Sequence, residues 1–417
     1  MTEWIELTAA EFCSSVRDGT HDSPKQSTIG KRLITSRHLN GHRLEVENAY
    51  LISQQDFDEI NKRSKVDQWD VLISMIGTVG EVYLEKGEPD YAIKNMGLFK
   101  SKDEESGRWL YYYLQSPQSQ AELFARCRGT TQKYIPLGEL RKFPIKFPID
   151  QFARESTINL LSVLDDKIEL NLRMNETLEA MARAVFRDWF VDFGPTRRKA
   201  AGTTDPAAII GGLLPNLTQA PPLAALFPDS FGENGLPEGW EEREVSSFAK
   251  LKGGKQLPKT EFVEEGDIPV FGGAGHMGNT DKANASGYVI SVGRVGAYCG
   301  NFVAHRGRAW INNNASFFEL KAKTKPEWFF YALRELDLTR IRKGAAQPFV
   351  SNSDIAKLSL VFPGDAVLEK FQGMLLPLIQ LIEANEQENQ TLAATRDILL
   401  PKLMSGDLRL TGAEGDA

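Results

Sequence analysis

The chain repeats one long helical sequence. The stretch LSVLDDKIELNLRMNETL at residues 161–178 returns 214 positions later as LLPLIQLIEANEQENQTL at residues 375–392. Eight of the eighteen positions are identical without a gap, including two asparagines. Solenoid repeats have periods of about 20–50 residues, so this period is far too long for one. The repeat therefore predicts two copies of a whole domain, each followed by a long helix.

The two copies share a coiled-coil register. With residue 161 at position a, apolar side chains recur at 3-4 spacing over roughly four heptads. The same two seam positions hold asparagine in each copy: Asn171 and Asn175, then Asn385 and Asn389. A seam asparagine fixes register, and a buried unpaired amide costs about 1–3 kcal/mol. We therefore predict that the helices pair antiparallel and satisfy these amides on each other. The alternative is two ordinary amphipathic core helices.

Further landmarks extend the repeat into the domains. The aromatic segment WLYYYL at 109–114 corresponds to WFFYAL at 328–333, and both segments predict helices. Apolar runs at 71–74 and 288–292 predict strands, each followed by a Gly-x-x-Gly turn into a second strand at 82–83 or 297–298. Each copy is therefore predicted to mix helices and strands.

The predicted organisation has five parts. They are a domain at 1–150, a helix at 151–195, a Gly/Pro/Ala-rich linker at 196–235, a second domain at 236–365, and a helix with a tail at 366–417.

Bulk composition is that of an ordinary globular protein. Apolar residues make up 41% of the chain, charged residues 25%, and the net charge is −7, so a nucleic-acid site must be a local basic patch. The longest apolar runs are too short to cross a bilayer, and the first residues do not resemble a secretory signal. Three scattered cysteines, Cys13, Cys127 and Cys299, fit free thiols in a reducing compartment. We expect a cytoplasmic protein.

Catalytic motifs are not found in the sequence. There is no phosphate-binding loop, no adenine-methylation motif of the Asn-Pro-Pro-Tyr type, and no nucleophile with a neighbouring base. Histidine and cysteine spacings do not suggest a metal site. We therefore predict no catalytic residue, no metal and no cofactor on this chain.

Basic loops remain as candidates for binding DNA. Arginine, lysine, threonine and histidine side chains in Gly/Asn/Gln-rich loops suit contacts to phosphates and to base edges. Solvated surface is the plainer interpretation of the same residues. The candidates are Arg17, Thr20, His21, Lys25, Lys31, Arg32 and Arg37 in the first half, and Lys250, Lys252, Lys255, Lys259, Arg294, Arg306, Arg308 and Lys343 in the second.

Several motifs resemble the specificity subunit of type I restriction-modification systems. The most specific is FRDWFVDFGP at 186–195, which is similar to that family's central signature. LFPDSF at 226–231, LPEGW at 236–240, DGTH at 18–21 and LPKLMSGDL at 400–408 are also similar to family landmarks. The family's Arg-Gly-x-x-Gly turn departs from its usual form at 76–80 and 292–296. The resemblance covers the chain from end to end.

The resemblance implies an α+β fold. Two α/β target-recognition domains would be separated by an antiparallel coiled coil of two long helices, with a pseudo-twofold internal repeat. Each domain would read one half of an asymmetric, bipartite double-stranded DNA site. Thirty helical residues span about 45 Å and a DNA turn about 34 Å, so the helices could act as a ruler.

The resemblance also implies partners. Two modification (methyltransferase) subunits would bind S-adenosylmethionine, and restriction subunits would bind ATP and Mg. Phe186, Trp189, Phe190 and Phe193 either anchor the modification subunit or fill the junction between helix and domain. Three other readings stay open: a specificity module of another methyltransferase-based defence complex, a two-headed protein-binding scaffold, and an enzyme with an unrecognised site.

Overall fold

The protein is described from a computed structural model. The structure describes residues 3–41, 43–212, 218, 220–264, 266–344 and 348–410. The chain divides into two compact units: unit 1 is Met1–Leu172 with Glu386–Ala417, and unit 2 is Arg173–Asn385. Both long helices, α6 (Gln151–Phe190) and α12 (Asp365–Ser405), contribute residues to both units.

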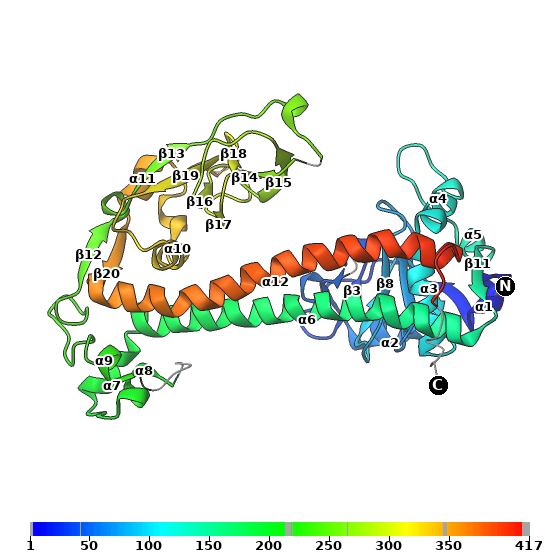
Figure 1. The fold of residues 1–417 in the computed structure, drawn as a ribbon, viewed down its shortest axis with the longest axis horizontal. Helices are drawn as coiled ribbons and strands as arrows, with labels where there is room; N and C mark the ends of the chain where they lie inside the picture. The colour runs from blue at the N-terminus through cyan, green and yellow to red at the C-terminus, as the bar shows by residue number, and fades with distance from the viewer. Residues whose placement is uncertain are drawn as a thin grey trace, which may run out of the picture. The chain divides into compact units, whose positions relative to one another are not determined.

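Unit 1 is built on an antiparallel sheet of order β2-β10-β7-β8. Its strands are β2 (Ser15–Asp18), β10 (Met96–Lys100), β7 (Val71–Ser74) and β8 (Val82–Leu84). Its edge strand β8 is labelled in Figure 1. The central strand β7 is buried at every position, which explains its continuous apolar run. Smaller sheets join β6 (Leu51–Ile52), β3 (Lys31–Ile34) and β9 (Tyr91–Ile93), then β1 (Trp4–Thr8) and β11 (Pro144–Pro148), and then β4 (Leu39–Asn40) and β5 (Arg43–Leu44).

Short helices close the core of unit 1. They are α1 (Ala9–Phe12), α2 (Gln54–Ser64), α3 (Glu104–Gln115), α4 (Pro117–Ala125) and α5 (Leu137–Arg141). The aromatic segment predicted as a helix is α3, which begins where the side chain of Asp103 accepts from the backbone N–H of Ser106 at 2.8 Å. Trp109 is fully buried, and its indole N–H donates to the carbonyl of Lys146 in β11 at 3.0 Å.

Unit 2 has the same topology. Its four-stranded sheet has the order β13 (Ala249–Gly253), β19 (Ala315–Leu320), β16 (Tyr288–Gly293), β17 (Phe302–Arg306). A three-stranded sheet joins β15 (Gly275–Thr280), β14 (Ile268–Gly272) and β18 (Trp310–Ile311), and β12 (Glu241–Glu244) pairs with β20 (Ser359–Phe362). In both units the three-stranded sheet contains one parallel pair, β3 with β9 or β14 with β18. The helices α10 (Pro326–Arg334) and α11 (Asn352–Ala356) correspond to α3 and α5. The internal repeat is confirmed.

One strand of unit 2 begins later than predicted. The sequence suggests a strand at 297–298, but β17 begins at Phe302. Gly296 and Gly300 both have positive φ, and the N–H of Gly300 donates to the carbonyl of Gly293 at 2.8 Å. The turn between the strands is therefore longer than the corresponding turn of unit 1.

The long helices pair antiparallel within each unit. In unit 1, Arg396 of α12 donates to Asp165 of α6 at 2.8 Å, and Asn171 Nδ2 donates to Asn389 Oδ1 at 2.9 Å. In unit 2, Asn385 Nδ2 donates to Asn175 Oδ1 at 2.8 Å. As the residue number increases along α6, the number of its partner on α12 decreases. The predicted antiparallel coiled coil is therefore confirmed. No helix in the described part of the chain has both the length and the apolar character that crossing a membrane requires.

The segment predicted as the linker is folded within unit 2. It contains α7 (Gly194–Ala200), α8 (Pro206–Ile210) and α9 (Ala220–Ala224), while residues 213–217 and 219 lie outside the described part. Ile210 and Leu223 are buried in the same apolar cluster as Trp189. The connection is therefore partly anchored rather than freely extended. The last residues of the predicted tail, 411–417, also lie outside the described part.

Candidate nucleic-acid interface

The turn after β2 brings together several predicted DNA-binding residues of unit 1. His21 Nε2 lies 3.0 Å from Asp18 Oδ2, and its Nδ1 lies 2.9 Å from Asn95 Oδ1. Arg63, in α2, pairs with the other oxygen of the Asp18 carboxylate. Thr20 forms a backbone bridge to the residue before Asn95. The turn is therefore held in one conformation, with the side chain of His21 largely exposed. Arg63 and Asn95 are not among the predicted residues, because they lie far from this turn in the sequence.

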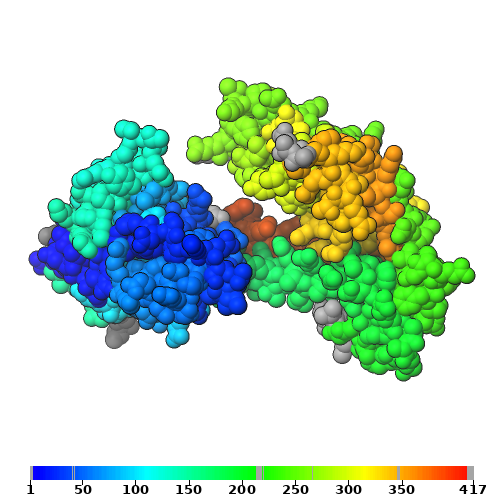
Figure 2. All heavy atoms as spheres, turned by 180° about the vertical axis from the view of Figure 1, so that it is seen from behind, coloured from blue at the N-terminus to red at the C-terminus, as the bar shows by residue number. Residues whose placement is uncertain are grey.

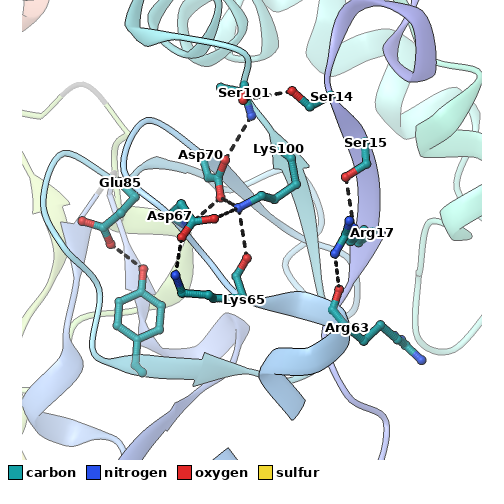
Figure 3. Close-up of polar contacts among 11 residues, drawn as sticks. Ser14, Ser15, Arg17, Arg63, Lys65, Asp67, Asp70, Glu85, Lys100 and Ser101 are labelled. Carbon is teal, nitrogen blue, oxygen red and sulfur yellow. Dashed lines mark hydrogen bonds and ion pairs between the residues drawn. The ribbon is translucent and has the colours of Figure 1, made fainter. Parts of the chain in front are cut away.

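Arg17 extends this arrangement along β2 (Figure 3). Its Nε donates to Ser15 Oγ at 3.0 Å and its Nη1 donates to the carbonyl of Arg63 at 2.9 Å. The side chain is exposed, so its remaining N–H groups can face a phosphate or a base edge. Arg17 and His21 are therefore exposed candidates whose side chains are held by neighbouring residues.

A buried ion pair supports the same sheet (Figure 3). The carboxylate of Asp70 pairs with Lys100 of β10 and accepts from the backbone N–H groups of Ser101 at 3.0 Å and Asp67 at 2.7 Å. Burial raises the pKa of Asp70, against the effect of Lys100 and the hydrogen bonds. The network ties β10 to the loop before β7. It is structural, because the Asp70 carboxylate is almost inaccessible to solvent.

The other predicted cations of unit 1 are dispersed. Lys31 of β3 pairs with Asp90 at 2.6 Å, and Arg32 donates to a backbone carbonyl at Ala49. Lys25 and Arg37 are exposed. Since Arg32 is held by the backbone, it is the least available of the seven candidates in this half.

The predicted lysines of unit 2 lie on β13 and the loop after it. Lys252 pairs with Glu319 of the neighbouring strand at 2.6 Å, and Lys250 and Lys259 are exposed. Lys252 and Lys255 line an open cleft of about 710 Å³. The cleft is therefore the place in unit 2 where predicted lysines converge on a concave surface.

The predicted arginine Arg306 pairs with acids of its own unit. It forms ion pairs with Glu327 and Glu383, and its guanidinium lies 4.8 Å from the ring centre of Tyr288. Its N–H groups are directed to the interior acids and to α12. The DNA contact of Arg306 therefore stays a prediction, and in this structure its guanidinium pairs with acids that are remote in the sequence.

Arg294 and Lys343 contribute to a second turn region, and Arg308 is exposed. The carbonyl of Arg294 accepts from the N–H of Val350 at 3.0 Å, and Lys343 pairs with Asp354 at 2.7 Å. These contacts place both residues beside an exposed hairpin that has a counterpart in unit 1.

The counterpart is the first hairpin, residues 128–134. Arg128 and Tyr134 exchange backbone hydrogen bonds of 2.8 and 2.9 Å. Lys133 accepts at its carbonyl from the N–H of Gly77, in the turn after β7, at 3.1 Å. Ile135 follows the hairpin and is buried. All seven hairpin residues are exposed, and the α4 region that leads into them, in cyan, projects from unit 1 (Figures 1 and 2).

The second hairpin, residues 343–349, repeats these contacts, although residues 345–347 lie outside the described part. Lys343 and Phe349 exchange backbone hydrogen bonds of 2.9 and 2.8 Å, and the N–H of Gly296 donates to the carbonyl of Pro348 at 2.9 Å. Phe349 and Tyr134 are each about two-fifths exposed, at 41% and 42%. The described residues of the second hairpin therefore make the same backbone contacts as those of the first, with different side chains.

Sequence reasoning found the match between the two hairpin segments but did not assign them to the interface. The signal was the shared Gly-x-x-Gln, at 129–132 and 344–347. Exposed polar tips such as Thr130, Thr131 and Gln132 carry the hydrogen-bonding groups that read base edges. A short two-stranded ribbon also fits the major groove. The hairpins are therefore added to the candidate interface.

The aromatic cluster at the end of α6 lies inside unit 2. Phe186, Trp189 and Phe190 are all buried, and they contact Phe371 of α12 with ring-centre distances of 5.9, 5.8 and 4.9 Å. Phe193 is half-buried and stacks edge-on against Trp240 at 5.8 Å. Filling the junction is thus the role that the burial favours. A partner could reach the three buried rings, those of Phe186, Trp189 and Phe190, only after the core opened.

The duplicated α+β domain on paired long helices defines a class of protein, the DNA specificity proteins of restriction-modification systems. The family model described as the type I restriction modification DNA specificity domain matches residues 25–180 and 237–394. The chain belongs to this family. Specificity subunits of this class are generally non-catalytic.

Individual relatives agree with this assignment. The chain is 25% identical over 339 residues to the type I restriction enzyme HindI specificity subunit of Haemophilus influenzae, covering 69% of this chain and 74% of that one. It is 24% identical over 339 residues to the MjaIX specificity subunit of Methanocaldococcus jannaschii, covering 74% and 71%. The crystal structure of a type I restriction-modification S subunit from Mycoplasma genitalium has the same fold, with a TM-score of 0.55, 19% identity and 96% coverage of both chains.

Proposed function

We propose that this chain is the DNA-reading subunit of a type I restriction-modification complex, in which each unit reads one half of an asymmetric bipartite site. The observation that carries the proposal is one topology present twice with different exposed residues. Tyr134 and Phe349, which are exposed at equivalent positions, differ, and the exposed Thr130 and Thr131 stand where the second half of the sequence has alanines. A repeated scaffold keeps the geometry of reading, while unlike side chains select unlike bases.

The chain positions DNA and performs no chemistry itself. Two modification subunits, carrying S-adenosylmethionine, would methylate an adenine in each half-site, and restriction subunits using ATP and Mg would add cleavage. Exposed cations such as Arg17, Lys250 and Lys259 supply phosphate contacts, which position the protein without reading sequence. Hydrogen-bonding side chains at the 17–21 turn and at the hairpins supply base contacts. Because the two sets of base contacts differ, the two half-sites should differ.

Methylation sequencing of host DNA tests the proposal. A host with the gene and its modification subunit should carry methylated adenine in a two-part asymmetric motif, and deletion of the gene should remove that motif alone. If no two-part motif disappears, the proposal fails.

Salt dependence supplies an independent measurement on the purified complex. Phosphate contacts release counterions, so affinity for the motif should fall steeply with rising salt. A protein-binding scaffold would show no preference for the motif at any salt concentration.

A further inference from the structure

Each unit contains one cation that ties its recognition sheet to a long helix. In unit 1, Lys86 follows the edge strand β8, and its Nζ lies 2.7 Å from Asp166 Oδ1 and 2.9 Å from Glu169 Oε2, both on α6. Although partial burial acts in the opposite direction, these two acids raise the pKa of Lys86. The lysine therefore stays charged and bridges two successive turns of the helix.

Unit 2 makes the same kind of contact with a different cation. Arg306 is the last residue of the edge strand β17, and its Nε lies 2.7 Å from Glu383 Oε1 on α12. It also pairs with Glu327 of α10, whose side chain is 1% exposed. Strand β17 occupies in its sheet the edge position that β8 occupies in the other.

The helix acids are equivalent in the repeat. Glu169 is the ninth residue of the stretch 161–178, and Glu383 is the ninth residue of the stretch 375–392. The cations are not equivalent, since one lies beyond its strand and is a lysine while the other ends its strand and is an arginine. Two unlike cations therefore reach the same helix position in the two units. Most neighbours of Glu169 along its helix differ between the two copies. The glutamate is therefore one of the few residues that both copies of the helix share.

We propose that Lys86 with Glu169, and Arg306 with Glu383, are positioning clamps that fix the orientation of each recognition sheet on its own long helix. This inference rests on the proposed function. One added base pair shifts a half-site by about 3.4 Å and rotates it by about 35°. A sheet held rigidly on its helix binds the displaced half-site poorly. A sheet that can reorient on its helix can still bind it. The clamps thus define which spacing between half-sites is accepted, and leave the choice of bases to the exposed loops.

Spacer tolerance tests the clamps on the assembled modification complex. Affinity is measured for duplexes carrying the methylated motif with its natural spacer, and with one base pair more or fewer. The wild type should prefer the natural spacer about tenfold, and Lys86→Met should reduce this preference to about twofold, a change of about 1 kcal/mol. Lys86→Arg, which keeps the cation, should retain the preference. Glu169→Ala, which removes the partner of Lys86 on α6, should reduce the preference for the natural spacer as Lys86→Met does.

The matched control is Lys62→Met, which removes an exposed ion pair with Glu59 on α2. It should leave the spacer profile unchanged. If Lys86→Met is folded, with the thermal midpoint of Lys62→Met, and still prefers the natural spacer about tenfold, the clamp is overturned while the proposed function stands. If the wild-type complex shows no preference for any two-part sequence, the proposed function itself is overturned, and the clamp with it.

Discussion

The Asn175–Asn385 pair allows a quantitative test of the seam. Asn385 Nδ2 donates to Asn175 Oδ1 at 2.8 Å, and the residues are only 8% and 6% exposed. Replacing either asparagine alone with leucine leaves the other amide buried without this bond, at a cost of about 1–3 kcal/mol. Replacing both removes both polar groups and restores an apolar seam. We expect the double variant to be at least as stable as the wild type, since seam asparagines sacrifice stability for register.

The expected shifts are large enough to measure. Unit 2 spans residues 173–385, and for a unit of this size about 2 kcal/mol moves the thermal midpoint by about 4–8 °C. Scanning calorimetry of the full chain should show that drop for Asn175→Leu and for Asn385→Leu, and full recovery in the double variant. Gln380→Leu, at an exposed position of α12, is the matched control and should change stability by less than about 0.5 kcal/mol.

Additivity would refute this reasoning. If the double variant loses the sum of the two single losses, the amides are not coupled and the seam does not depend on their pairing. A double variant that recovers its stability but no longer assembles one defined species would instead support the register role, because two leucines tolerate neighbouring registers.

Three further outcomes follow from buried groups. Trp189→Ala should destabilise unit 2 by about 3–5 kcal/mol, seen as a lower calorimetric midpoint, because the indole is fully buried. Asp165→Ala should cost about 1–3 kcal/mol in urea unfolding, since Arg396, at 14% exposure, loses its bond to Asp165 and keeps only its pairing with the exposed Asp397. Burial lowers the pKa of His305, so its neutral form contributes stability that is present above its ordinary pKa and lost as pH falls below it. His305→Gln should therefore flatten the midpoint-versus-pH curve in acid.

The helices and the repeated strands could be predicted because burial leaves a periodic trace in the sequence. Val71–Ser74 is apolar at nearly every position since side chains on both faces of the strand are buried, Val71 and Ile73 in one apolar cluster and Leu72 in another. The seam of α6 has apolar residues at 3-4 spacing since one stripe meets α12. The seam asparagines were visible for the same reason, as polar residues that interrupt an apolar stripe at equal positions in two copies. Local pattern was sufficient for these features.

The partners of individual cations could not be predicted in the same way. Arg306 and Lys250 look alike in sequence, each a basic residue in a segment predicted as a DNA-binding loop. Arg306 forms ion pairs with Glu327 and Glu383, while Lys250 is exposed to solvent. The acids that decide this come from other elements, and no period connects them to the cation. A basic residue in a loop therefore indicates a DNA contact only after its intramolecular partners are known.

The same limit explains the hairpins, and it points to what the duplication has kept. Arg128 pairs with Glu139, and Lys343 pairs with Asp354, at equivalent positions and with every residue type changed. What recurs is the contact rather than the side chain. A cation paired with an acid at the base of a hairpin holds that base in place, whichever residues the tip carries. Such anchoring allows the tips to change without moving the surface that presents them, and a scaffold of that kind can acquire two unlike halves while keeping one geometry.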